Sequence, residues 1–204
     1  MMSLFNRIKE YFSGPGGEDI SEDMLEERIE ERIEERRGYI HIYTGDAAGK
    51  TSAALGRALR AVGHGHRVVV LQFLKGREDI GEYLISERLG PEYEIHQYGT
   101  ESFINPDNPS EWDRELARSC LDDVARYLAE EPDVLILDEI CYACAYGLIE
   151  AQDVVDVLEN KPPGTYVILT GRNAPRELLE IADIATELVD LKDRETTAQE
   201  GIEY

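Results

Sequence analysis

The stretch from Tyr39 to Ser52, YIHIYTGDAAGKTS, contains the residue types of a phosphate-binding loop. Its apolar and aromatic start suits a strand, its glycines allow backbone conformations that other residues resist, and the residues from Lys50 onward suit a helix. Backbone N–H groups at such a turn form a nest for phosphate oxygens, Lys50 adds a positive charge, and Thr51 can place its hydroxyl on Mg²⁺. We therefore predict a triphosphate site made of Thr44, Gly45, Asp46, Ala47, Ala48, Gly49, Lys50, Thr51 and Ser52.

The spacing of this loop departs from the common form. Three residues separate Gly45 from Gly49, where the common loop has four, and Thr44 stands at the place of the first glycine. An ordinary turn between a strand and a helix does not require the run GKTS, which favours the phosphate-binding interpretation.

A second signal is an apolar strand that ends in two carboxylates, VLILDE at residues 134–139. This is the arrangement of a Walker B strand, which we expect to lie beside the P-loop strand. Parallel sheets bind ligands at the carboxyl ends of their strands, where both motifs end. The pattern predicts a divalent-cation site formed by Thr51, Asp138 and Glu139.

These motifs need a parallel sheet to bring them together, and the chain from Gly38 onward alternates strands and helices as such a sheet requires. The apolar runs VVVLQF and VLIL suit central strands that are covered on both faces. We predict an α/β, RecA-like P-loop fold, in which a mostly parallel sheet is flanked by helices, over residues 38–204. The expected strands are 39–43, 67–73, 93–97, 133–137, 165–170 and 186–191, and the expected helices are 50–62, 80–89, 111–130, 151–159 and 175–182.

Residues 1–37 have a different pattern, which predicts an N-terminal helical extension. A turn-like SGPGG at residues 13–17 precedes a segment, residues 20–37, with Glu and Arg four residues apart and a narrow apolar stripe at Leu25, Ile29 and Ile33. Such a helix either lies solvated on its own domain or covers the site of a partner subunit.

The composition excludes several classes of protein. A formal net charge of −22, with 43 acidic against 21 basic side chains, disfavours binding to nucleic acid or to anionic lipid. No apolar run is long enough to cross a membrane and the start lacks a secretory pattern, so we expect a cytoplasmic protein. The three cysteines indicate reduced thiols, and the CxxC at Cys141 and Cys144 follows a strand as two small apolar residues would.

Further motifs follow downstream in a fixed order. With YTG…GKT, they are RAVGHG at 60–65, QFLKG at 72–76, Gly81-Glu82, LDExxY at 137–142, TGR at 170–172 and GIEY at 201–204. By this series the chain resembles the P-loop ATP:corrinoid adenosyltransferases, which act on cob(I)alamin or cob(I)yrinic acid a,c-diamide. The resemblance implies transfer of the 5′-deoxyadenosyl group of ATP to Co(I) of a reduced corrinoid, such as cobalamin, cobinamide or cobyrinic acid a,c-diamide. It also implies Mg²⁺ or Mn²⁺, a reductant for cobalt, and a homodimer.

The resemblance also assigns roles to single residues. It implies that Lys50, Thr51 and Glu139 are catalytic. Ten residues beyond Lys50, Arg60 lies about 15 Å along a helix, so it would touch the nucleotide away from the usual phosphate contact. Phe103, in the irregular stretch 98–110, would pack on the corrin or, alternatively, anchor the loop to the core. The implied ATP-binding residues further include Arg60, Gln72, Lys75 and Arg172, and the implied corrinoid-binding residues are Phe103, Trp112, Tyr142 and Glu82.

The loop differs from the family pattern at two positions. The family commonly has GNGKGKT or GDGKGKT, so Ala47 and Ala48 replace a glycine and a lysine. This removes backbone freedom and one positive charge from the phosphate site. Two other functions stay open from the residues alone: a P-loop ATP hydrolase or nucleotide-dependent switch without corrinoid chemistry, and a non-catalytic relative that binds nucleotide or corrinoid.

Overall fold

The computed structural model describes residues 38–100, 109–192 and 197–202. The expected helical extension at residues 1–37 and the expected corrinoid contact Phe103 lie outside these ranges, so both stay predictions. Every distance and contact below belongs to the described residues.

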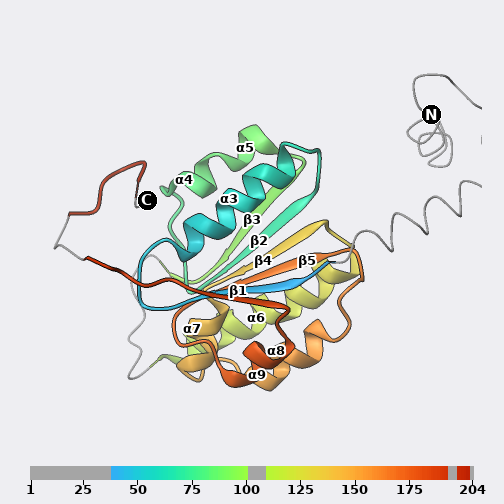
Figure 1. The fold of residues 1–204 in the computed structure, drawn as a ribbon, viewed down its shortest axis with the longest axis vertical. Helices are drawn as coiled ribbons and strands as arrows, with labels where there is room; N and C mark the ends of the chain where they lie inside the picture. Colours follow the sequence, from blue (N-terminus) through green and yellow to red (C-terminus); the bar gives the residue numbers. More distant parts are fainter. Residues whose placement is uncertain (1–37, 101–108, 193–196, 203–204) are drawn as a thin grey trace, which may run out of the picture. The chain divides into compact units, whose positions relative to one another are not determined.

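A six-stranded, all-parallel sheet forms the centre of the molecule, in the order β3-β2-β4-β5-β1-β6 (Figure 1). The predicted α/β class and parallel sheet are therefore confirmed. The expectation that the Walker B strand lies beside the P-loop strand is wrong, because β5 lies between β1 and β4 and pairs with both. The strands are β1 (Ile40–Thr44), β2 (Val68–Phe73), β3 (Tyr93–Tyr98), β4 (Val134–Asp138), β5 (Tyr166–Thr170) and β6 (Ile184–Glu187).

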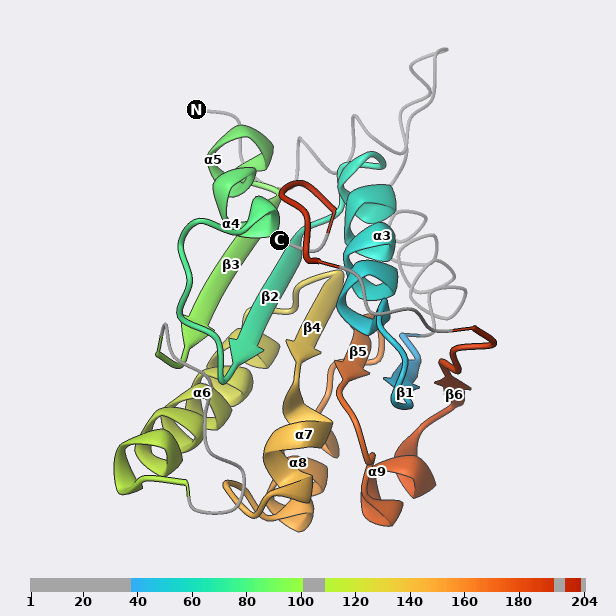
Figure 2. The same cartoon turned by 90° about the vertical axis from the view of Figure 1, so that its left-hand side faces the viewer.

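Helices cover both faces of this sheet, which is why its central strands β2 and β4 are mostly apolar, with buried polar residues only near their carboxyl ends (Figure 1). The strands point the same way, so that the P-loop, the start of α3 and the start of α7 lie at one edge (Figure 2). One face carries α3 (Lys50–Val62), α4 (Gly81–Leu84) and α5 (Ser86–Leu89). The other carries α6 (Glu111–Ala129), α7 (Ile140–Ala145), α8 (Ala151–Leu158) and α9 (Arg176–Ile181).

Two hydrophobic cores follow from this arrangement, one on each face. Alternate residues of one strand enter different cores: Val70 of β2 packs in the core that contains Ala54 of α3, whereas Leu71 packs in the core that contains Val124 of α6. All six residues of β2 and all five of β4 are buried. The sheet is thus a rigid support for the side chains that follow its strands.

Most predicted elements match, and three differ for physical reasons. The predicted helix at 80–89 is two short helices, α4 and α5, which meet at Ile85. Helix α7 was not predicted, because CYACA after the Walker B motif reads as a short apolar segment of no clear period. The last strand, predicted at 186–191, is β6 at 184–187; after it, Leu188 donates its N–H to Thr44 O and the chain turns toward the P-loop.

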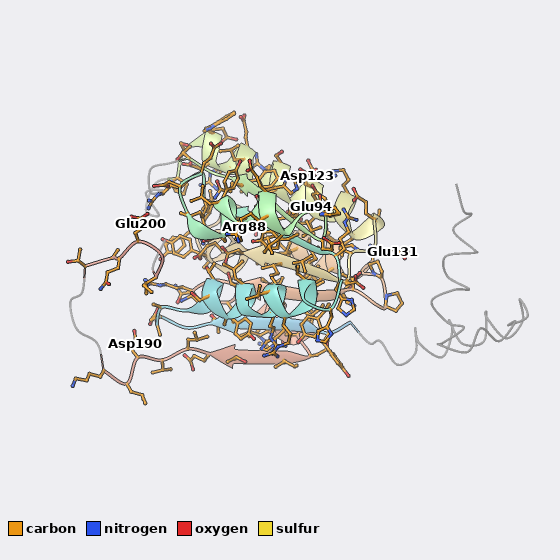
Figure 3. The ribbon with its side chains drawn as sticks, turned by 90° about the horizontal axis from the view of Figure 1, so that it is seen from above. Arg88, Glu94, Asp123, Glu131, Asp190 and Glu200 are labelled. Atoms are coloured by element: carbon orange, nitrogen blue, oxygen red, sulfur yellow. The ribbon has the colours of Figure 1, made fainter. Side chains whose placement is uncertain are left out.

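Strand β3, at one edge of the sheet, is lined by charged side chains. Arg67 pairs with Glu94 of β3 and with Glu130, and Arg126 pairs with Asp123 and Glu130. Figure 3 labels Glu94 and Asp123 on this side of the molecule. Charges at an edge disfavour pairing with another strand. Within the ranges that the structure describes, no helix has the length and apolar character that a membrane span needs.

Candidate functional site

The P-loop turns at its two glycines. Gly45 has φ 100° and Gly49 has φ 99°, a left-handed conformation that strains other residues. Neither Ala47 nor Ala48 has a positive φ, so neither alanine is in the left-handed conformation that would strain it. Gly45 is also needed for space, because a Cβ there would lie 2.3 Å from the carbonyl oxygen of Leu188.

Lys50 is folded back over this loop. Its buried ammonium donates hydrogen bonds to Gly45 O and to Ala47 O, each at 2.7 Å. Burial lowers the pKa of Lys50, and Arg172 adds to that effect, while the Glu139 carboxylate opposes it. These electrostatic effects indicate that Arg172 and Glu139 both lie within reach of the loop.

Asp138 is the centre of the polar cluster at the end of β4. Its Oδ1 accepts hydrogen bonds from Thr51 Oγ1 at 2.8 Å and Thr170 Oγ1 at 2.7 Å, and its Oδ2 accepts from Lys75 Nζ at 2.6 Å and Gln72 Nε2 at 3.1 Å. Burial alone would raise the pKa of this carboxyl, which is 1% exposed, but Lys75 and the hydroxyl donors hold its pKa below the ordinary value. Asp138 is therefore an anion inside the protein.

Lys75 brings a positive charge to two of the three residues that were predicted to bind a cation. Besides Asp138, its ammonium contacts Thr51 Oγ1 at 3.3 Å. The loop that carries Lys75 has a fixed path, because Gly76 and Gly99 approach so closely that a Cβ on Gly76 would lie 2.6 Å from Gly99 O. The ammonium thus lies where a cation that touched both Thr51 and Asp138 would lie.

Glu139 follows in an unusual backbone conformation. Its φ of 65° is left-handed, its N–H donates to Thr170 Oγ1 at 2.9 Å, and α7 begins at the next residue. Burial and the neighbouring Asp138 raise the pKa of Glu139, against the opposite effect of Lys75 and Lys50. Within the described ranges, no hydrogen bond engages its carboxylate. A non-glycine residue held in this conformation is typical of functional sites.

The cluster suits a divalent cation of the Mg²⁺ type. Thr51, Asp138 and Glu139 supply only oxygen atoms, and Mg²⁺ is bound in proteins by one or two carboxylates together with substrate phosphates and water. Four hydrogen bonds already engage Asp138 and two engage Thr51 Oγ1, whereas the Glu139 carboxylate has none within the described ranges. No group of three or more His, Cys, Asp or Glu side chains with metal-binding geometry occurs in the part of the chain that the structure describes.

Further residues extend the cluster away from the P-loop. Gln72 Nε2 donates to Glu82 Oε1 at 3.2 Å as well as to Asp138, which joins α4 to the end of β2. Two participants were not predicted. Thr170 was visible as the first residue of TGR, whereas the signal for Gln97, which donates to Gln72 Oε1 at 2.9 Å, was a polar residue on the face of β3 that holds the buried Tyr93 and Ile95.

Three of the predicted residues lie outside this hydrogen-bonded cluster. Arg60 is exposed in the last turn of α3, at the opposite end of the helix from Lys50. Trp112 lies near the start of α6 and is 58% exposed. Tyr142 lies on α7, where its ring packs against Tyr146 with centroids 4.3 Å apart. The structure places these side chains in the P-loop domain without joining them to Asp138.

Comparison with known proteins gives consistent matches. A family model described as ATP:corrinoid adenosyltransferase BtuR/CobO/CobP matches residues 36–204. The chain is 39% identical over 172 residues to a corrinoid adenosyltransferase of Escherichia coli K12, covering 82% of this chain and 86% of that protein. It is 37% identical to the corrinoid adenosyltransferase CobA of Salmonella typhimurium, with the same coverage, and 34% identical to a corrinoid adenosyltransferase of Pseudomonas aeruginosa, covering 82% and 84%.

Proposed function

Since the chain belongs to the ATP:corrinoid adenosyltransferase family BtuR/CobO/CobP, we propose that it transfers the 5′-deoxyadenosyl group of ATP to Co(I) of a reduced corrinoid and releases triphosphate. One observation carries this proposal from the family to the site. The 2.8 Å hydrogen bond from Thr51 to Asp138 joins the phosphate-binding loop to the acidic cluster at the carboxyl edge of the sheet. A triphosphate and its counter-ion can therefore bind side by side.

The reaction requires that the two substrates be positioned, and it does not require a nucleophile from the protein. A lone pair of Co(I) forms the bond to C5′ of the ribose while the bond from C5′ to the triphosphate oxygen breaks, and the electron pair leaves with the triphosphate. The thiols fit a passive role, because burial raises the pKa of Cys120, Cys141 and Cys144 and so disfavours the thiolate. The protein's task is to align C5′ with cobalt and stabilise the leaving group.

We assign the stabilisation of the triphosphate leaving group to Lys50 and the N-terminus of α3. The ammonium that now bonds to two loop carbonyls would turn to the phosphate oxygens, which are stronger acceptors because they are charged. The N–H groups of the loop and of the first turn of α3 would add further donors. Arg172 brings a second positive charge near Lys50, and Arg60, Gln72 and Lys75 complete the proposed ATP contacts.

For the cation, Mg²⁺ or Mn²⁺, Thr51 and Glu139 would be ligands and Asp138 a direct or water-mediated partner. Bound there, the ion would neutralise charge that develops on the triphosphate. Lys75 would then leave the cation position for a phosphate oxygen within reach. Its ammonium thus serves as the counter-charge of Asp138 whenever the cation is absent.

The corrinoid contacts are proposed from the family resemblance. Glu82, Tyr142 and Trp112 come from α4, α7 and α6, the helices that follow β2, β4 and β3 in the chain. Phe103 is proposed as the residue that packs on the corrin. A reductant for cobalt, a homodimer and a cytoplasmic location are proposed on the same basis.

The direct test mixes the full chain with ATP, Mg²⁺ and chemically reduced cobalamin. We expect a light-sensitive cobalt–carbon product and one triphosphate for each corrinoid adenosylated. ADP and phosphate without a corrinoid product would overturn the proposal in favour of hydrolysis. The matched variants are Lys50→Ala, which we expect to lower transfer at least a hundredfold, and Lys192→Ala, which we expect to leave it unchanged; circular dichroism confirms that each variant is folded.

A further inference from the structure

Gln72 is a fully buried amide between two acidic side chains. Its Nε2 donates to Asp138 Oδ2 at 3.1 Å and to Glu82 Oε1 at 3.2 Å. The amide has a donor end and an acceptor end of nearly the same shape. If it turned over, its oxygen would face both carboxylates, and neither carboxylate could donate a hydrogen bond to it. The site therefore depends on which way this amide faces.

Gln97 provides a hydrogen-bond donor that favours this orientation of the Gln72 amide. In the parallel ladder of β2 and β3, Gln97 is the direct partner of Gln72. Its Nε2 donates to Gln72 Oε1 at 2.9 Å and to the carbonyl oxygen of Arg77 at 3.0 Å. Both N–H bonds of the Gln97 amide are used, and its donor end faces the acceptor end of Gln72.

We propose that Gln97 is a positioning residue that fixes the side-chain amide of Gln72 with its donor end toward Asp138 and Glu82. It touches neither carboxylate itself and acts through Gln72. The bond to Arg77 O holds the Gln97 amide itself in the orientation that presents its N–H to Gln72 Oε1. The consequence for adenosyl transfer rests on the proposed function, whereas the orientation of the amide does not.

The first experiment measures that orientation without any substrate. In the full chain labelled with ¹⁵N-glutamine, the exchange of the Gln72 side-chain N–H₂ with solvent is followed by NMR. We expect Gln97→Met, which keeps the length of the side chain and removes its donors, to speed this exchange about tenfold or more. Gln152→Met, at an exposed position of α8, is the matched control and should leave the Gln72 signals as they are.

A second experiment asks whether Gln97 acts through Gln72. Gln97→Met should lower kcat/KM of adenosyl transfer about tenfold, as expected when a residue that supports a ligand is lost. In a Gln72→Met background the same change should have almost no effect, because the amide that Gln97 orients is gone. Equal effects in both backgrounds would indicate a merely structural role and overturn the proposal.

Two further outcomes keep the inference separate from the proposed function. Unchanged Gln72 exchange in a folded Gln97→Met chain would overturn the positioning role even if transfer were confirmed. Faster exchange in a chain that transfers no adenosyl group would support the positioning role and count against the function. If Gln97→Met does not fold, Gln97→Thr makes the comparison, since threonine suits a strand and its hydroxyl is too short to reach Gln72.

Discussion

The pair of Lys75 and Asp138 allows a quantitative prediction of stability. Lys75 Nζ lies 2.6 Å from a carboxylate oxygen that is almost completely buried, and the Lys75 side chain is 27% exposed. At this distance and an effective dielectric constant of 20, the attraction is about 6 kcal/mol, but the desolvation of both charges offsets much of it. Removing one partner of a buried pair costs about 3 to 5 kcal/mol, because an uncompensated charge stays inside.

For Lys75→Met we expect the lower end, a loss of about 3 kcal/mol in the free energy of unfolding, because donors from Thr51, Thr170 and Gln72 still serve the Asp138 carboxylate. For Asp138→Asn we expect a loss of about 2 kcal/mol in the free energy of unfolding, because the Lys75 side chain, which is 27% exposed, can turn to water.

The double variant Lys75→Met with Asp138→Asn should lose only about 3 kcal/mol in total, because it leaves no buried charge, which gives a coupling of about 2 kcal/mol. Urea denaturation at pH 7 without nucleotide or divalent cation measures all four chains. Arg176→Met, which removes an exposed ion pair with Glu180, should cause no measurable change. A coupling near zero, or a Lys75→Met chain as stable as the original, would refute the assignment of Lys75 as counter-charge.

Three other predictions concern parts of the domain away from the site. Burial, with a contribution from Arg57, lowers the pKa of His41 from its ordinary 6.5. The folded chain therefore binds fewer protons than the unfolded chain, and the free energy of unfolding should fall as the pH drops below 6.5. His41→Gln should flatten this dependence in urea titrations from about pH 7.5 to 5. The Lys161 ammonium donates hydrogen bonds to the carbonyls of Gly38, Pro162 and Thr165 at 2.7 to 3.1 Å. Lys161→Met should therefore lower the free energy of unfolding by about 2 kcal/mol. A loss below half of that would mean that water replaces the ammonium. Gly38→Ala would put a Cβ 2.0 Å from Thr165 O and should cost about 3 kcal/mol in the same assay, whereas unchanged stability would show that the backbone yields there.

Local patterns predicted the parts of the site that lie within one segment. The run GKTS and the apolar strand before Asp138 depend on neighbouring residues, and the start and end of α3 were predicted at Lys50 and Val62. The order of the strands was not predictable in the same way. That β5 lies between β1 and β4 depends on how the crossover connections pack. The same apolar strands would also suit the predicted order, in which β4 lies beside β1.

Thr170 and Gln97 were not predicted as site residues because their roles depend on contacts between strands. Gln97 lies on the same face of β3 as the buried Tyr93 and Ile95, where the alternation gives no reason to expect a polar residue, and its register opposite Gln72 gives it a partner at the site. Likewise, the sequence alone does not give the backbone conformation at Ala47. The sequence shows which residue replaces a family glycine, but only the backbone shows that the position has no left-handed φ.

The position of β1 also has a consequence for the order of events during synthesis. The strand that leads into the P-loop pairs only with β5 and β6, and its first N–H, at Ile40, bonds to Asp183, 143 residues later. The loop's glycine at position 45 rests on Leu188, which follows β6. A ribosome therefore completes the phosphate-binding segment long before the residues at 183–188 that support it. Such distant pairing slows folding, so a nascent chain of this protein acquires nucleotide-binding capacity only after these later residues have been made.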